Sequence, residues 1–118
     1  DLFLAPDEWS GRFDLVVESY TLQVLPPDLR ERAIEAIASF VAPGGTLIVI
    51  ARGREPNEPE GKMPWPLTKD EMALFQTYDL NEVSFEDYMD HEDPPVRRFR
   101  ATYCRRLRER PTNQLRGR

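Results

Sequence analysis

Three polar residues with side chains that could do chemistry, Glu18, Ser19 and Tyr20, directly follow an apolar run over residues 13–17. Consecutive apolar residues, rather than alternating ones, indicate a strand buried on both faces, as in parallel sheets covered by helices. Ligands bind at the carboxyl ends of such strands. A carboxylate and a phenol at this edge could accept a hydrogen bond from a substrate or align it. Glu18 and Tyr20 are therefore candidate catalytic residues.

The other reactive side chains predict no metal site. Cys104 is the single cysteine, which excludes an internal disulfide and a cysteine-cluster metal site. His91 is the single histidine and lies among Asp90, Glu92 and Asp93 before two prolines. This spacing lacks the glycine and the terminal glutamate of a calcium-binding loop. We expect a solvated histidine in a turn.

A helix and a second strand must position the candidate residues. Apolar residues recur at helical spacing after Pro26-Pro27, whereas Arg30 and its charged neighbours fall on the opposite, solvated face of the helical wheel. Pro43 cannot continue the helix, and Gly44-Gly45 predicts a sharp reversal before an apolar strand over residues 46–51. The unit is a strand, a crossover helix and a parallel strand, and both strands should be covered on both faces.

The remaining segments predict a loop, a short helix and two further strands. Residues 53–66 hold four prolines and no apolar periodicity, which fits either a lid or a disordered loop. Thr68 and Glu71 form a capping box before a helix over residues 69–76. Apolar residues then alternate with polar ones over residues 80–88, where Val83 and Phe85 share the buried face, and over residues 96–104. These two strands are plausible antiparallel partners at the sheet edge.

Composition and charge narrow the class of protein. The chain has 118 residues, enough for one domain, and no apolar run long enough to cross a bilayer. Residues 1–96 hold 20 of the 21 acidic and 7 of the 16 basic residues, a net charge of −13, whereas residues 97–118 hold nine arginines and one glutamate. The arginines could contact nucleic acid, but the acidic part would repel phosphate and the tail has no aromatic residue for stacking. We expect residues 107–118 to be a disordered tail.

Two strands buried on both faces need neighbours that this chain hardly supplies. The chain also starts on Asp1 rather than on methionine. We therefore expect residues 1–106 to be the C-terminal portion of a larger α/β domain, a fragment whose remaining strands lie elsewhere.

The order of these motifs resembles the C-terminal half of a class I S-adenosylmethionine-dependent methyltransferase. The resemblance covers residues 1–103 and rests on Asp1-Leu2, Phe13-Asp-Leu-Val-Val-Glu18, the crossover helix, Val41-Ala-Pro-Gly-Gly-Thr-Leu47 and the two closing strands. It implies a Rossmann-like, doubly wound, mostly parallel sheet with an antiparallel edge strand. The four strands of this chain would be the fourth, fifth, sixth and seventh of that fold.

The resemblance also implies ligand contacts. Asp1 and Leu2 would meet the adenine ring of S-adenosylmethionine, and Glu18, Ser19 and Tyr20 would face its methionine part and the substrate. The family's glycine-rich loop and its ribose-binding acid are absent from this sequence, and Gly44-Gly45 lies at the wrong spacing to replace the loop. We therefore expect the isolated 118-residue chain to be inactive.

The function predicted from the sequence is methyl transfer from S-adenosylmethionine to a small-molecule acceptor, by a cytoplasmic enzyme with no membrane or nucleic-acid partner. A receiver domain is a second α/β candidate, but it needs an aspartate where this chain has Glu18. A third is a non-catalytic module that completes its sheet with another chain. The sequence leaves the acceptor atom and the oligomeric state open.

Overall fold

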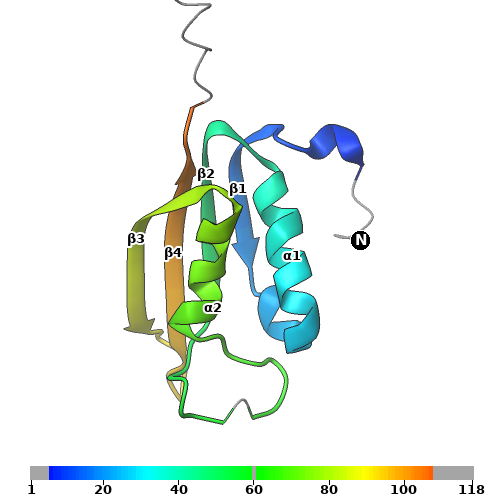
Figure 1. Ribbon diagram of the computed structural model, residues 1–118. Coiled ribbons are helices and arrows are strands. Elements are labelled where there is room, and N and C mark those ends of the chain that lie inside the picture. The colour runs from blue at the N-terminus through cyan, green and yellow to red at the C-terminus, as the bar shows by residue number, and fades with distance from the viewer. Residues whose placement is uncertain (1–5, 60, 108–118) are drawn as a thin grey trace, which may run out of the picture.

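The computed structural model describes residues 6–59 and 61–107, which form one mixed sheet with helices on one face (Figure 1). The four strands of these residues lie in the order β1-β2-β4-β3, so the last of the described strands is inserted between β2 and β3. The strands are β1 (Phe13–Ser19), β2 (Val41–Arg52), β3 (Leu80–Met89) and β4 (Arg97–Arg105). The helices are α1 (Pro27–Ser39) and α2 (Lys69–Ala73), with short 3-10 turns η2 (Asp7–Trp9), η3 (Leu22–Val24) and η4 (Leu74–Tyr78).

The crossover unit predicted from the sequence is confirmed. β1 and β2 are parallel, with Leu15 opposite Thr46 and Ser19 opposite Ile50, and α1 connects them. Ala33 and Ile34 of α1 are fully buried. Pro27 is the first residue of α1, where a backbone amide has no acceptor within the helix, so a proline loses no hydrogen bond there. Asp28 beside it complements the helix dipole.

The glycine pair does not make the predicted reversal. β2 already starts at Val41, which pairs with Phe13 of β1. Pairing is then interrupted and resumes between Leu15 and Thr46, so four residues of β2 lie opposite one residue of β1. A Cβ on Gly45 would lie 2.9 Å from a backbone oxygen in β2 and 3.1 Å from each of two in β1. Glycine is required because the two backbones approach closely at this irregular position.

The two C-terminal strands are antiparallel partners, as predicted, and β4 also pairs antiparallel with β2. The alternation in β4 is confirmed because Phe99, Ala101 and Tyr103 are all fully buried. The alternation predicted for β3 is wrong at Val83, which is 62% exposed. The register shifts between Glu82 and Ser84, and this bulge turns Val83 away from the core.

β1 is exposed on one face, contrary to the prediction that both faces are covered. Leu15 and Val17 are 59% and 57% exposed, while Ile48 and Ile50 of the adjacent β2 are half-buried. Figure 1 shows the reason, because α1 and α2 both lie on the same face of the sheet and β1 forms its edge. Among the described residues no helix covers the opposite face.

The helix after the proline loop starts where the sequence places it but is shorter than predicted. Thr68 accepts the Glu71 amide, and Glu71 accepts the Thr68 amide, so the capping box is confirmed. The α-helix ends at Ala73 and continues as the 3-10 turn η4. This change of winding lets Met72 and Phe75 both enter the core, where they are fully buried.

Candidate functional site

The chain makes an abrupt turn where β1 ends. Tyr20 has φ of 69°, the left-handed region that a tyrosine rarely adopts, and its amide still donates to the Ile50 carbonyl at 3.0 Å. The backbone then enters η3 immediately. Such conformations persist where the surrounding structure holds them, and they concentrate at functional sites. The predicted site therefore lies on a constrained turn at the carboxyl edge of the sheet.

Glu18 lies beneath this turn and is 7% exposed. Its Oε2 accepts hydrogen bonds from the amides of Thr21, at 2.9 Å, and Leu22, at 3.3 Å. The carboxylate thus satisfies two amides at the start of η3 that have no helical partner. The structure places Glu18 at the predicted edge and shows it holding the turn.

Tyr20 is 43% exposed and lies beside a residue of β4. The Arg98 guanidinium lies 5.0 Å from the centre of the Tyr20 ring, a distance at which a cation is attracted by the aromatic face. Arg98 also donates to Asp90, at 2.9 Å, and to Glu92, at 2.7 Å. Arg98 is a contact that the sequence analysis missed, because only the insertion of β4 brings it close to β1.

Two of the predicted ligand-binding residues fall outside the described part of the chain, and a third lies at the turn. Asp1 and Leu2 are outside the described residues. Ser19 is exposed as the last residue of β1, directly before Tyr20. Of the predicted set, the structure brings together Glu18, Ser19 and Tyr20.

Gln23 connects η3 to both ends of the segment between β2 and α2. Its backbone carbonyl accepts the Trp65 amide at 2.5 Å, and its side-chain oxygen accepts the Arg52 amide at 2.7 Å. Gln23 is 5% exposed. A buried amide side chain with a partner of this kind fixes the relative position of the two backbones. The segment therefore starts and ends against the turn that follows β1.

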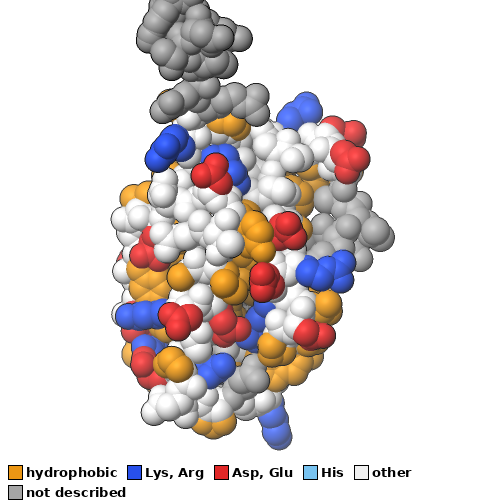
Figure 2. Space-filling view, viewed as in Figure 1, with side chains coloured by type: hydrophobic (Ala, Val, Ile, Leu, Met, Phe, Trp, Pro, Cys, Tyr) orange, Lys and Arg blue, Asp and Glu red, His pale blue; other side chains and the backbone are white. Residues whose placement is uncertain are grey.

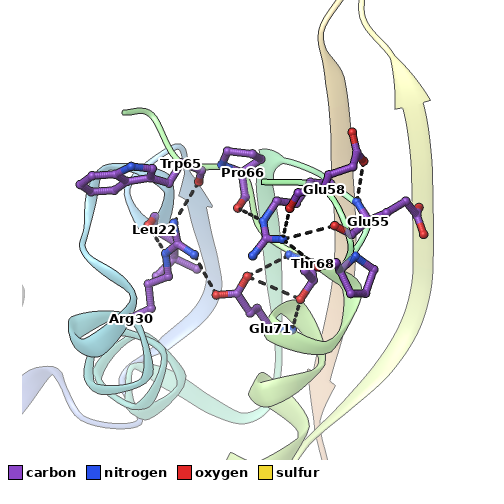
Figure 3. A network of polar contacts seen from close by, with 10 residues as sticks. Leu22, Arg30, Glu55, Glu58, Trp65, Pro66, Thr68 and Glu71 are labelled. Atoms are coloured by element: carbon purple, nitrogen blue, oxygen red, sulfur yellow. Dashed lines mark hydrogen bonds and ion pairs between the residues drawn. The ribbon is translucent and has the colours of Figure 1, made fainter. Parts of the chain in front are cut away.

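Arg30 of α1 is buried, with 2% of its surface exposed, although the helical wheel placed it on the solvated face. Its guanidinium donates to the Leu22 carbonyl at 3.2 Å, to the Trp65 carbonyl at 3.1 Å and to the Glu71 carboxylate at 2.8 Å (Figure 3). Burial of a charge is tolerated where it is paired and hydrogen-bonded. No local signal in α1 predicts this, because two of the partners are 35 and 41 residues away.

The described residues of the proline loop over residues 53–66 are folded around Arg54. Arg54 donates to the carbonyls of Pro66, at 3.3 Å, and Glu58, at 2.8 Å. Glu58 in turn accepts the Glu55 amide at 2.8 Å (Figure 3). Arg97 of β4 binds Glu55 at 2.7 Å. The loop is therefore attached to the sheet by side chains as well as by its ends.

The surface of this edge combines apolar side chains with paired charges. Val24 and Met63 are 43% and 58% exposed. Figure 2 shows that acidic and basic side chains are interspersed over the face that it presents. Next to Tyr20, hydrogen bonds from the Val96 amide, the Glu92 amide and Arg98 lower the pKa of Asp90 to about 2. The carboxylate is therefore ionised and already paired at neutral pH.

The glycines of the described residues do not form a phosphate or cofactor cradle at this edge. Gly44 and Gly45 lie at the opposite, amino end of the sheet. Gly53 follows β2, but a Cβ there would lie 2.5 Å from the Phe99 ring, so this glycine faces the core. These residues therefore do not fit a complete site for S-adenosylmethionine, and we derive no reaction step from that cofactor.

Residues 6–59 and 61–107 contain neither a metal-binding cluster nor a helix that could cross a membrane. These residues contain no group of three or more side chains suited to binding a metal ion. None of the helices in this part of the chain is long and apolar enough to cross a membrane. A small cavity lies at the amino end of the sheet, away from Glu18 and Tyr20; it is lined by Ser10, Gly11, Ser39, Val41, Pro43 and Arg105.

No family model matches the sequence, and no curated protein matches it either. Solved structures do match the fold. A SAM-dependent methyltransferase from Methanosarcina mazei has a TM-score of 0.72 at 15% identity, over 92% of this chain and 66% of that chain. The 1,6-didemethyltoxoflavin-N1-methyltransferase of Burkholderia thailandensis, solved with S-adenosylhomocysteine, has a TM-score of 0.71 at 14% identity, over 89% and 48%. The [4+2]-cyclase SpnF has a TM-score of 0.71 at 15% identity, over 92% and 54%.

This chain thus spans about half to two-thirds of the length of these proteins. In the described residues, β1 and β2 are parallel and β4 is inserted antiparallel beside β3, as the resemblance noted in the sequence implies. At 14–15% identity the likeness concerns the fold. The chain has the fold of the class I S-adenosylmethionine-dependent methyltransferases.

Proposed function

We propose that this chain is part of a methyltransferase domain that transfers a methyl group from S-adenosylmethionine to a small-molecule acceptor. The observation that carries the proposal is the strand order β1-β2-β4-β3 with an antiparallel β4, in a fold matched by two methyltransferases, one of them solved with S-adenosylhomocysteine. In this chemistry the cofactor supplies the reactive methyl group. The protein supplies binding and alignment.

We assign different roles to the three residues at the turn. Ser19 and Tyr20 are exposed at the carboxyl edge and would contact the ligands. Glu18 would act by holding the turn that presents them, since its Oε2 is bound to the amides of Thr21 and Leu22. By the resemblance, Asp1 and Leu2 would meet the adenine ring.

The two edges of the sheet support the proposal that residues 1–106 are the C-terminal portion of a larger domain. β3 carries Glu82, Glu86 and Asp87 and a bulge, features that protect a true edge strand from pairing. β1 instead exposes Leu15 and Val17 on one face. We infer that β1 is an interior strand of the whole sheet, and that the rest of the domain pairs with it and covers this face.

The proposed partner is a small molecule because residues 1–96 carry a net charge of −13, which repels nucleic-acid phosphates. We also propose a cytoplasmic location, because Cys104 is the single cysteine and cannot form an internal disulfide. Arg98 and Arg100 do not form a free basic patch, since both are paired with carboxylates.

The test is a titration of the isotope-labelled 118-residue chain with S-adenosylhomocysteine, followed by amide chemical shifts. We expect weak binding, with the shift changes concentrated at Ser19, Tyr20 and Thr21, because the chain holds only part of the site. Adenosine, which lacks the amino-acid part, is the control ligand and should leave these amides unchanged. A folded chain whose amides do not respond to about 5 mM S-adenosylhomocysteine would contradict the proposal.

A second candidate function is a non-catalytic module that completes its sheet with another chain. The exposed apolar residues of β1 at the sheet edge favour this second function. SpnF, a neighbour with this fold, is named as a [4+2]-cyclase, so the fold alone does not fix the activity. In this case the ligand titration gives no response. The amides of β1 instead become protected from hydrogen exchange as the concentration of the chain, or of a partner, increases.

A further inference from the structure

We propose that Arg30 is a positioning residue that holds η3 and the proline loop as one fixed wall at the carboxyl edge of β1. The use of this wall for an acceptor rests on the methyltransferase function proposed above. The role of Arg30 in holding η3 and the loop in place does not rest on that function, because it follows from contacts within the chain. The two can therefore be tested separately.

The guanidinium of Arg30 binds three segments of the chain at once, and it adds to the backbone contact that Gln23 makes with Trp65. Its Nε donates to the Leu22 carbonyl in η3, its Nη2 to the Trp65 carbonyl in the loop, and its Nη1 to Glu71 in α2. These donors lie in the fixed plane of one guanidinium group, so the three acceptors must keep a fixed geometry. A lysine ammonium has no such planar arrangement.

Glu71 couples this contact to the start of α2. Its Oε2 binds Arg30 at 2.8 Å, while its Oε1 accepts the Thr68 amide at 3.0 Å. One carboxylate therefore completes the capping box and the ion pair. The Arg30 side chain is 2% exposed and that of Glu71 is 24% exposed, so water screens this pair less than a surface pair.

The proline loop also carries the half-buried indole of Trp65. In Figure 3 the Trp65 ring extends from the loop over the segment that contains Leu22 and away from Pro66. Its backbone is held on both sides, by Gln23 at the amide and by Arg30 at the carbonyl. A wall that is fixed before the ligand arrives does not need to be ordered on binding, which favours affinity.

The experiment compares Arg30→Met with the parent chain, both carrying Trp9→Phe so that Trp65 is the single fluorophore of its kind. The first readout is the rate of tryptic cleavage between the exposed residues Lys62 and Met63. The second is the emission maximum of Trp65, together with its quenching by acrylamide. Arg12→Met, which removes an exposed arginine before β1, is the matched control.

We expect Arg30→Met to raise the cleavage rate about tenfold or more, because each lost charge-assisted hydrogen bond increases the population of the open loop by about that factor. The Trp65 emission should shift to longer wavelength, a change that a loss of global stability alone does not cause in the folded protein. Arg30→Lys should fail to restore either value. Arg12→Met should leave both values unchanged.

Glu71→Gln keeps the test decisive if Arg30→Met does not fold. The side-chain amide that this substitution introduces still has an oxygen that can accept the Thr68 amide, so the variant removes the ionic contact with Arg30 and preserves the cap. We expect it to raise cleavage after Lys62 in the same direction. If a folded Arg30→Met or Glu71→Gln chain shows parent-like cleavage and Trp65 emission, the proposal is wrong, whatever the outcome of the S-adenosylhomocysteine titration.

Discussion

The Glu18 carboxylate accepts the Thr21 amide at 2.9 Å and so ties the end of β1 to the turn that follows it. Glu18→Ala removes this cap and should lower the free energy of unfolding by about 1–2 kcal/mol. Glu18→Gln keeps an acceptor oxygen and should retain most of the stability. Urea denaturation of the three chains checks this, and equal stability of all three would show that the carboxylate does not hold the turn.

Tyr103 makes a buried hydrogen bond that depends on one hydroxyl group. The Tyr103 hydroxyl donates to the Met72 carbonyl at 2.6 Å, and burial raises the pKa of this phenol. Tyr103→Phe leaves the carbonyl without this partner and should cost about 1–2 kcal/mol of unfolding free energy. The control is Tyr78→Phe, since the Tyr78 hydroxyl binds Glu31 in an exposed position at 3.4 Å. A cost for Tyr78→Phe as large as that for Tyr103→Phe would contradict the prediction.

The charged pairs of β3, β4 and the turn between them predict sensitivity to acid. Hydrogen bonds from Arg100 and Arg97 lower the pKa values of Glu86 and Asp87, and the Val96 amide is the main cause of the fall at Asp90, from 3.8 to about 2. A carboxyl group with a lower pKa in the folded state stabilises the fold above its unfolded pKa and loses this effect as the pH falls towards the folded value. Stability should therefore fall between about pH 4 and pH 2.

Urea midpoints measured across this range check the acid prediction. Asp90→Asn should make the urea midpoint less dependent on pH, because it removes the carboxyl group whose pKa is lowered to about 2. Glu8→Gln, an exposed change in η2, is the control and should leave the slope unchanged. A parent chain whose urea midpoint is constant from pH 5 to about pH 2 would contradict the assignment.

Two glycines of the same segment should respond differently to an added methyl group. At Gly53 a Cβ would lie 2.5 Å from the buried Phe99 ring, so Gly53→Ala should destabilise the chain by about 1–3 kcal/mol through overpacking. At Gly61 a Cβ would meet nothing within 4 Å, so Gly61→Ala should cost only the backbone strain of φ +70°, about 1–2 kcal/mol. Thermal denaturation of the two variants compares them, and the reverse order would exclude the contact with Phe99.

The two edges of the sheet should differ in their tendency to associate. Leu15→Lys and Val17→Lys place a charge on the exposed face of β1 and should reduce both dye binding and self-association of the isolated chain. Val83→Lys, at a residue that is 62% exposed on β3, is the control and should change neither. Sedimentation velocity and fluorescence of a hydrophobic dye measure the two effects. Equal effects at Val17 and Val83 would show that β1 is an ordinary edge.

Features that depend on neighbours in the sequence were predicted well. The alternation of Phe99, Ala101 and Tyr103 marked the buried face of β4, and Thr68 with Glu71 marked the start of α2. Both are set by residues within a few positions of each other. The family resemblance supplied the order of the strands, which local periodicity does not contain.

Features that depend on distant partners were missed. Arg30 was placed in solvent because its helical position is polar, and only Trp65 and Glu71 explain its burial. Val83 was placed inside because the bulge that turns it out is a property of the pairing of β3 with β4. The contact between the Glu18 carboxylate and the amides of Thr21 and Leu22 was also missed, and the direct ligand role predicted for Glu18 stays a prediction.

The central position of β4 has a consequence for how the chain is made. Thr46 of β2 pairs with Cys104, which is synthesised 58 residues later, and β3 reaches β2 only through β4. Until β4 has been synthesised, β3 and the β1–β2 pair cannot join into one sheet. Completion of the sheet therefore depends on β4, and a premature stop codon before Arg97 would leave two separated halves that expose apolar surface.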